Sequence, residues 1–194
     1  MKIVENANLW ADIRAPVPVD KRSALFLDRD GTLIELVDYL SDPSAVKLIT
    51  DTVLEVRKAN EAGEAVVIVT NQSGVGRGYY DWEVLQAVQA RLYDLLSAVS
   101  ATVDATYACP HPPPDAGGPE HSRYRKPAPG MLIRASEDLN LDLARSRIIG
   151  DRVSDLAAGK AAGLASGTLV ACGYGIRDLE AARLLASDEF TVNQ

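Results

Sequence analysis

The chain has 194 residues, a length that suits one domain with a well-buried core. Its apolar fraction of 47% is ordinary for a globular protein, and no apolar run approaches the roughly 20 residues of a membrane span. The net charge of −7 disfavours nucleic-acid binding, because an acidic protein repels a phosphate backbone unless it has a dedicated basic face. No basic run of that kind occurs, so we expect neither a nucleic-acid nor a membrane partner.

The first residues and the cysteines indicate the cellular compartment. The segment MKIVENANLWADIR lacks the basic and continuously apolar regions of a signal peptide. Cys109 and Cys172 are too few for a disulfide framework, which is compatible with a reducing compartment. We therefore expect a cytoplasmic protein, and we expect it to be a monomer.

Residues 1–22 lack the pattern of a helix or a regular strand. They contain Pro16 and Pro18 and show no sustained hydrophobic periodicity. We expect them to form an extended arm that lies on a single domain of residues 23–194, with Trp10 as its anchor.

From Ser23 onward, strand-like and helix-like segments alternate. The β-branched run of residues 65–70 is typical of a strand covered on both faces, and residues 51–63 carry an apolar helical stripe. The predicted strands span residues 24–27, 65–70, 103–109, 146–151 and 167–172, and the predicted helices span residues 51–63, 82–99, 130–140, 153–163 and 179–185. This alternation predicts an α/β fold, a Rossmann-like three-layer sandwich with a mainly parallel sheet.

Polar stretches follow the predicted strands. In open parallel sheets, ligands bind beyond the carboxyl ends of the strands, so these stretches should meet in one crevice. They are DRD at residues 28–30, TNQS at 70–73, CPH at 109–111 and GDRVSD at 150–155, while RYRKP at 123–127 follows a long loop.

The aspartates in these stretches indicate a cation site. Asp28, Asp30 and Asp151 would repel one another at this sheet edge unless a cation lies between them. A hard divalent ion with oxygen ligands meets that need, and Mg²⁺ is the usual choice beside phosphate. Asp155 is either a fourth carboxylate of this group or an acidic residue that stabilises the first turn of a helix.

The same residues suit phosphoryl transfer. Asp28 is placed as a nucleophile that forms an aspartyl-phosphate, and Asp30 as the acid that protonates the leaving oxygen and then deprotonates water. The Thr70 hydroxyl and the Lys126 ammonium would neutralise and position the phosphoryl oxygens.

Local turn chemistry adds two expectations. Gly31 allows a sharp exit from the first predicted strand, and the Thr32 hydroxyl should hydrogen-bond the backbone there. The stretch GVGRG at 74–78 lacks the Gly-Lys-Ser/Thr ending of a nucleotide-binding loop, so we expect a flexible turn. Arg77 within it either reaches a second phosphate of the substrate or is merely exposed.

Four motifs in a fixed order carry a family resemblance. DRDGT, VTNQS, RKPAPG and GDRVSD occur in that order, and together they resemble the haloacid dehalogenase (HAD) superfamily of phosphatases. NQSGVGRGYY, CPHPPP and RKPAPGML resemble the branch of D-glycero-D-manno-heptose 1,7-bisphosphate 7-phosphatases and histidinol-phosphate phosphatases. The resemblance covers roughly residues 24–172.

The resemblance implies roles for the matching positions. Asp28 would be the nucleophile and a Mg²⁺ ligand, Asp30 the acid/base and a ligand through its main-chain carbonyl, and Asp151 the third ligand. Thr70 and Lys126 would stabilise the phosphoryl group. The implied substrate contacts are Asn71, Gln72, Ser73, Arg125 and Arg152, the last standing where relatives often carry lysine.

One motif departs from the family pattern. Many members bind structural Zn²⁺ through a Cys-x-His pair and a Cys-x-Cys pair. Here the first pair is Cys109 and His111, whereas Ser122 and Tyr124 occupy the positions of the second. Structural zinc needs four ligands, so we expect a loop without zinc, stiffened by its prolines. In the alternative, His121 or Glu120 completes the site.

The spacing between motifs limits the substrate. Neither residues 31–69 nor residues 71–125 leave room for a large cap domain, so loops alone would cover the site and admit extended small molecules. Arg77, Arg125 and Arg152 are concentrated cations in an acidic protein and argue for a substrate with two phosphates.

We therefore expect a Mg²⁺-dependent phosphomonoesterase, most specifically one acting on the C7 phosphate of a heptose bisphosphate. Histidinol phosphate is an alternative substrate, for whose amine Glu35 or Asp38 would serve, and another small phosphorylated metabolite is a further one. A catalytically silent phosphosugar-binding module is disfavoured, because Asp28 and Asp30 are both present.

Overall fold

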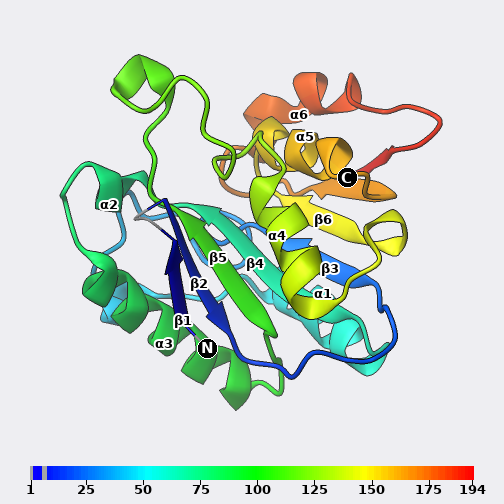
Figure 1. The fold of residues 1–194 in the computed structure, drawn as a ribbon, viewed down its shortest axis with the longest axis horizontal. Coiled ribbons are helices and arrows are strands. Elements are labelled where there is room, and N and C mark those ends of the chain that lie inside the picture. The colour runs from blue at the N-terminus through cyan, green and yellow to red at the C-terminus, as the bar shows by residue number, and fades with distance from the viewer. Residues whose placement is uncertain (1, 6–7) are drawn as a thin grey trace.

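The computed structural model describes residues 2–5 and 8–194, with side chains from residue 8 onward. These residues form one eight-stranded sheet in the order β1-β2-β5-β4-β3-β6-β7-β8, with helices on both faces (Figure 1). The strands are β1 (Lys2–Glu5), β2 (Leu9–Ile13), β3 (Ala24–Leu27), β4 (Ala65–Asn71), β5 (Ala105–Cys109), β6 (Arg147–Gly150), β7 (Ser166–Leu169) and β8 (Thr191–Asn193). The α-helices are α1 (Thr50–Glu61), α2 (Ser73–Gly76), α3 (Trp82–Ala98), α4 (Gly130–Leu139), α5 (Val153–Ala161) and α6 (Gly175–Arg183).

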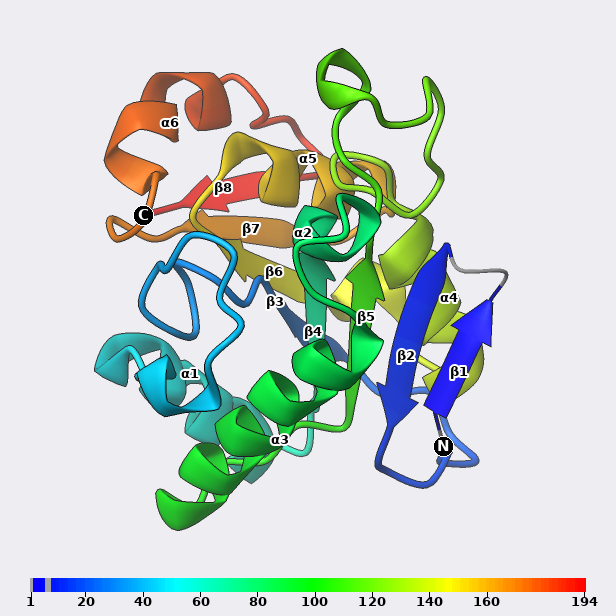
Figure 2. The same cartoon turned by 90° about the vertical axis from the view of Figure 1, so that its left-hand side faces the viewer.

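Two hydrophobic cores, one on each face of the sheet, explain the predicted pattern. Ala24 and Phe26 of β3 pack in the core that includes α4, α5 and α6, whereas Leu25 and Leu27 pack with α1 and α3. All four side chains are buried, so β3 reads as a continuous apolar run. Figure 2 shows α1 and α3 together on one side of the sheet. The predicted three-layer α/β sandwich with a mainly parallel sheet is confirmed.

The described residues contain no large cap domain. The connection from β3 to α1 holds only the single-turn 3-10 helix η1 (Pro43–Ala45), and the connection from β5 to α4 holds only η2 (Pro114–Ala116). The η2 segment stands out beyond the body of the molecule in both views (Figure 1, Figure 2). None of the helices in the described part of the chain is both long and apolar enough to cross a membrane.

The N-terminal segment forms strands that the sequence analysis did not predict. β2 pairs antiparallel with β1 and with β5, where Trp10 lies opposite Ala108. Trp10 is 1% exposed and packs with Tyr80, Leu85 and Ala108, which confirms it as the anchor. β2 is therefore a strand of the sheet rather than a segment resting on it. Residues 1, 6 and 7 of the predicted arm lie outside the described residues.

The exit from β3 matches one local expectation and contradicts another. Gly31 has φ +85°, in the left-handed region that favours glycine. The prediction for Thr32 was wrong, because its buried hydroxyl has no hydrogen-bond partner among the described residues. The amides of residues 32–34 all donate to the Arg29 carbonyl, so no nearby amide is left for that hydroxyl. The Thr32 carbonyl instead accepts from the Thr52 hydroxyl at 2.7 Å.

Several further segments differ from their predicted boundaries, among them β5, which starts at Ala105 rather than at residue 103, and α6, which spans Gly175–Arg183 rather than residues 179–185. The stretch expected as a flexible turn at residues 74–78 begins inside the short helix α2. β7 ends at Leu169 rather than at residue 172, because the chain turns through Gly173 at φ +56° and starts α6 at Gly175. β8 was not predicted.

Replacing Trp10 with alanine should lower the free energy of unfolding by about 3–5 kcal/mol, because it leaves a cavity between β2 and α3. Denaturant unfolding followed by circular dichroism measures the change. The control Val19→Ala alters a side chain that is 96% exposed and should stay within about 0.5 kcal/mol of the parent protein. A loss below about 1 kcal/mol for Trp10→Ala would show that the segment contributes little to the fold.

Candidate active site

A cavity of about 1050 Å³ lies at the carboxyl ends of the parallel strands. It brings together every predicted catalytic, metal and substrate residue, and Asp155 as well. These residues are Asp28, Asp30, Thr70, Asn71, Gln72, Ser73, Arg77, Arg125, Lys126, Asp151, Arg152 and Asp155. The strand-end rule therefore predicted correctly that these residues lie around one cavity.

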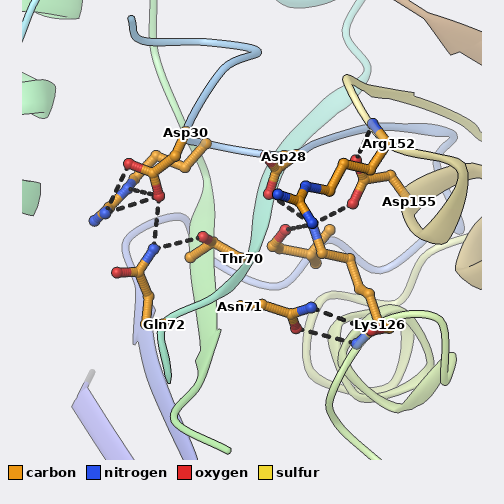
Figure 3. Close-up of polar contacts among 10 residues, drawn as sticks. Asp28, Asp30, Thr70, Asn71, Gln72, Lys126, Arg152 and Asp155 are labelled. Atoms are coloured by element: carbon orange, nitrogen blue, oxygen red, sulfur yellow. Dashed lines mark hydrogen bonds and ion pairs between the residues drawn. The ribbon is translucent and has the colours of Figure 1, made fainter. Parts of the chain in front are cut away.

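Three buried carboxylates form the floor of this cavity. Asp28, Asp151 and Asp155 each place an oxygen within 4.8 Å of the others. Lys126 Nζ lies 2.6 Å from Asp28 Oδ1 and 2.7 Å from Asp155 Oδ1 (Figure 3). The Asp30 carboxylate, which was expected near this group, does not belong to it. Asp155 takes that place.

Among the described residues, the three carboxylates of this cluster outnumber the cation that pairs with them. Burial raises the pKa of Asp28, and the carboxylates of Asp155 and Asp151 raise it further against the opposing effect of Lys126. Burial also raises the pKa of Asp151 to about 6. One ammonium thus faces three carboxylates from which water is largely excluded, and an oxygen-liganded divalent cation fits this donor set.

The backbone around Asp151 is shaped to hold its carboxylate. A Cβ atom on either Gly31 or Gly173 would collide with Asp151 Oδ2, so both positions need glycine. The Tyr174 amide donates to the same oxygen at 2.9 Å. The turn after β7 therefore fixes a side chain that follows β6.

Lys126 is held by both its side chain and its backbone. Nζ donates to the Val69 carbonyl at 2.7 Å, and the Asn71 side-chain amide makes two 3.1 Å hydrogen bonds with the Lys126 backbone. Burial alone would lower the pKa of Lys126, but the ion pairs with Asp155 and Asp28 outweigh it and raise the pKa. Lys126 therefore stays charged, and Asn71, predicted as a substrate contact, is used to position it.

Asp155 has two partners, which explains its burial. Its Oδ1 pairs with Lys126, and its Oδ2 accepts from the Arg152 amide at 3.0 Å at the start of α5. The two explanations weighed from the sequence, a carboxylate of the cluster and a helix N-terminal residue, both apply to it.

On the other side of Thr70 lies a second polar group (Figure 3). Gln72 Nε2 donates to Asp30 Oδ2 at 2.7 Å and to Thr70 Oγ1 at 2.8 Å, and Gln72 Oε1 accepts from the Tyr80 hydroxyl at 2.7 Å. Arg29 donates to both oxygens of Asp30 at 3.0 Å. Gln72 was predicted to contact substrate, yet its amide here binds protein groups.

Arg29, Tyr80 and Tyr174 contact these residues, although no role was predicted for them from the sequence. Arg29 stands between the two aspartates of DRDGT, and Tyr80 ends NQSGVGRGYY, so both lie inside motifs that were singled out. Tyr174 lies just beyond β7, where the strand-end rule would have found it.

The three arginines predicted to bind substrate phosphate are among those that line the cavity. Arg152 stacks on the Tyr174 ring, with Cζ 3.7 Å from the ring centroid, and Arg125 donates to the His111 carbonyl at 2.7 Å. Burial lowers the pKa of Arg125, and the charges of Arg152 and Arg77 lower it further. Arg77 Nε is buried and has no hydrogen-bond partner among the described residues. This part of the cavity suits an anion.

Cys109 and His111 of the CPH stretch contact Ser122 rather than further residues that could bind zinc. Ser122 Oγ lies 2.6 Å from His111 Nδ1 and 3.7 Å from Cys109 Sγ. In the described part of the chain, neither His121 nor Glu120 joins Cys109 and His111 in a group that could hold a metal ion. Ser122 thus links the two half-site residues by hydrogen bonds.

Only one of the two acidic candidates for an amine contact faces the cavity. Asp38 lines it, whereas Glu35 does not and pairs with Lys47 at 3.4 Å.

Comparison with known proteins identifies the family. A HAD-hydrolase-like family model matches residues 123–189. The D-glycero-β-D-manno-heptose-1,7-bisphosphate 7-phosphatase of Mesorhizobium japonicum is 47% identical over 150 residues, which is 76% of this chain and 69% of that protein. The D-glycero-D-manno-heptose-1,7-bisphosphate 7-phosphatase of Thermosynechococcus vestitus is 39% identical over 82% of this chain and 84% of its own.

Solved structures agree with these relatives. A HAD-like phosphatase from Mesorhizobium loti superposes with a TM-score of 0.79 at 39% identity, covering 93% of this chain and 96% of its own. The D,D-heptose 1,7-bisphosphate phosphatase of B. bronchiseptica, crystallised with magnesium and phosphate, gives a TM-score of 0.76 at 29% identity, covering 89% of this chain and 92% of its own. The chain therefore belongs to the haloacid dehalogenase superfamily, as one of its phosphatases, which are hydrolases of phosphoric monoesters.

Proposed function

We propose that this protein is a Mg²⁺-dependent phosphatase that removes the C7 phosphate of D-glycero-D-manno-heptose 1,7-bisphosphate through an aspartyl-phosphate, in a nucleotide-activated heptose pathway. The observation that carries the proposal is the Asp28–Lys126 ion pair at 2.6 Å, on the floor of a cavity whose wall holds Asp30. The activity printed in the names of its relatives supports the same substrate.

In the first step, Asp28 attacks phosphorus. The bond from phosphorus to the leaving oxygen breaks as the bond to Asp28 forms, and the carboxyl proton of Asp30 passes to the leaving oxygen. Lys126 and Thr70 bind the oxygens of the transferring group and neutralise part of its charge.

In the second step, water attacks the aspartyl-phosphate. The Asp30 carboxylate takes a proton from the water while the bond from phosphorus to Asp28 breaks. Inorganic phosphate leaves, and both aspartates return to their starting protonation states. One residue thus serves as acid and then as base.

Asp28 and Asp151 would hold Mg²⁺, with Asp155 beside them and the Asp30 carbonyl as a further ligand. When bound, the ion supplies positive charge for the phosphoryl oxygens and relieves the repulsion among the carboxylates. The relative crystallised with magnesium and phosphate supports this assignment.

Substrate selection rests on the arginines. Arg77, Arg125 and Arg152 line the same cavity as the nucleophile and can receive a second phosphate of the substrate. The names of the relatives include both the β and the α anomer of the heptose, so either anomer is compatible with them.

Histidinol phosphate is the second candidate substrate, and Asp38 is the observation that favours it. This aspartate lines the cavity, where a carboxylate would pair with the substrate's amine. The three arginines favour the bisphosphate instead, because a monophosphate leaves them without an anionic partner.

Asp28→Asn should lower kcat by about 10⁴-fold or more while the fold stays intact, because an amide cannot accept the phosphoryl group. Phosphate release measures turnover, and circular dichroism checks the fold. The exposed, remote Asp94→Asn is the matched control and should keep normal turnover. Near-normal activity of Asp28→Asn would show that Asp28 is not the nucleophile.

Mg²⁺ should raise the melting temperature, because it binds the carboxylate cluster only in the folded state. A Mg²⁺ concentration of about 100 times the Kd should raise the free energy of unfolding by about 2.7 kcal/mol. In a protein of this size, each kcal/mol raises the melting temperature by about 2–4 °C. Protons compete for the same oxygens, and burial raises the pKa of Asp28 to about 8 and that of Asp151 to about 6, so the shift should shrink as the pH falls through this range. Asp151→Asn should abolish most of the shift, whereas Asp94→Asn should keep it. An unchanged shift in Asp151→Asn would place the ion elsewhere.

Phosphate release from the heptose 1,7-bisphosphate, the heptose 7-phosphate and histidinol phosphate tests the substrate. We expect the highest kcat/KM for the bisphosphate. Arg152→Ala should raise KM for the bisphosphate by about 10-fold or more, with little effect on the 7-phosphate, because only the former has a second phosphate. The exposed Arg57→Ala on α1 is the control. A preference for histidinol phosphate would overturn the heptose assignment.

A further inference from the structure

Gln72 is a buried amide at the edge of the active site, and it is only 4% exposed. Both of its polar atoms are engaged by protein groups, as its Nε2 binds Asp30 and Thr70 and its Oε1 binds Tyr80. A buried amide with three partners is held in one orientation, because losing any partner leaves a polar atom unsatisfied. Gln72 therefore connects two reacting residues to a third residue farther from the reaction.

The direction of each hydrogen bond follows from the chemistry of the groups. Asp30 Oδ2 accepts from both Arg29 Nε and Gln72 Nε2, so the proton that Asp30 transfers belongs on Oδ1. The NH₂ group of Gln72 therefore faces Asp30, and its Oε1 faces Tyr80. Burial raises the pKa of Tyr80 to about 12, so its hydroxyl keeps the proton that it donates. The Tyr80 hydroxyl therefore donates to the Oε1 that faces it and stabilises this orientation of the Gln72 amide.

This orientation determines what Thr70 can do. Thr70 Oγ1 accepts one N–H of Gln72 at 2.8 Å. Its own hydroxyl proton is then available to donate into the cavity, toward an oxygen of the transferring phosphoryl group. A reversed Gln72 amide would take that proton instead.

Asp30 is held from one side in the same way. Arg29 is 1% exposed and donates Nε to Asp30 Oδ2 and Nη2 to Oδ1, and Gln72 adds a bond to Oδ2. The Asp30 side chain still keeps 20% of its surface exposed. These donors stabilise the negative charge that appears on Asp30 as it gives up its proton, and they leave its cavity side for the leaving oxygen.

The Tyr80 ring is fixed independently of the site. It packs with Trp10 of β2, Leu85 of α3 and Ala108 of β5. Gly74 lies against the ring so closely that a Cβ atom there would collide with it. The packing of β2, α3 and β5 around the ring therefore positions the Tyr80 hydroxyl next to Gln72.

We propose that Tyr80, Gln72 and Arg29 are positioning residues for the phosphatase reaction, which orient the Asp30 carboxyl group and the Thr70 hydroxyl. This inference rests on the proposed function, in which Asp30 is the general acid. It assigns Gln72 to the catalytic machinery rather than to substrate recognition.

The test is the dependence of kcat/KM on the leaving group. An alkyl phosphate such as the heptose bisphosphate needs a proton on its leaving oxygen, whereas an aryl phosphate with an acidic phenol needs little help. The value of kcat/KM depends only on the steps up to release of the alcohol or phenol. It therefore measures the action of Asp30 as an acid and not its later action as a base. Tyr80→Phe should lower kcat/KM about 10-fold for the alkyl phosphate and no more than about 2-fold for the aryl phosphate.

Gln72→Leu should give the same pattern with a larger loss, and Tyr80→Phe added to it should cause no further loss, because the link is already broken. Tyr93→Phe is the matched control. It also removes the hydroxyl of a partly buried tyrosine, one that binds Thr106 away from the cavity, and it should change kcat/KM for neither substrate. Circular dichroism and melting curves show whether each variant folds. If Tyr80→Phe does not fold, the result for Gln72→Leu decides the test.

Equal losses on the two phosphates, or none, would overturn the positioning role while leaving the phosphatase assignment intact. Failure of the parent protein to hydrolyse either phosphate in Mg²⁺ would instead overturn the proposed function itself. A raised KM with unchanged kcat in Gln72→Leu, alike for both leaving groups, would return Gln72 to a substrate-binding role.

Discussion

The repulsion among Asp28, Asp151 and Asp155 is the constraint on which the rest of the site depends. Three carboxylates are buried within 4.8 Å of one another, and Lys126 contacts two of them. Such a cluster costs folding free energy unless a second cation joins it. The fold tolerates it because two glycines, a backbone amide and the helix start at Arg152 hold the carboxylates in place.

The parallel sheet supplies the geometry for this arrangement. β3, β4 and β6 are neighbours, so the residues that follow them meet without any long connection. Hydrophobic cores on both faces make these strands rigid, and the polar side chains extend from their ends. The nucleophile and the acid are also held on different sides of Thr70, because Lys126 binds Asp28 on one side and Gln72 binds Asp30 on the other (Figure 3).

The sequence predicted the central strands and the location of the site because both depend on local patterns. Continuous apolar runs mark β3 and β4, and the aspartates follow such runs directly. β1, β2 and β8 have three to five residues and no alternating pattern, and their pairing depends on strands far along the chain. The hydrogen-bond partners of Asn71 and Gln72 could not be predicted from the sequence for a related reason. Sequence shows which side chains arrive at the sheet edge, but tertiary packing decides which of them bind one another.

The pairing of β2 with β5 has a consequence for the behaviour of shortened chains. β2 covers the backbone N–H and C=O groups along one side of β5. A chain that began at residue 23 would expose those groups on a flat, hydrophobic strand, which is a template for pairing between molecules. Such a fragment would aggregate through its sheet edge. The first strands therefore prevent association between molecules as well as stabilising the fold.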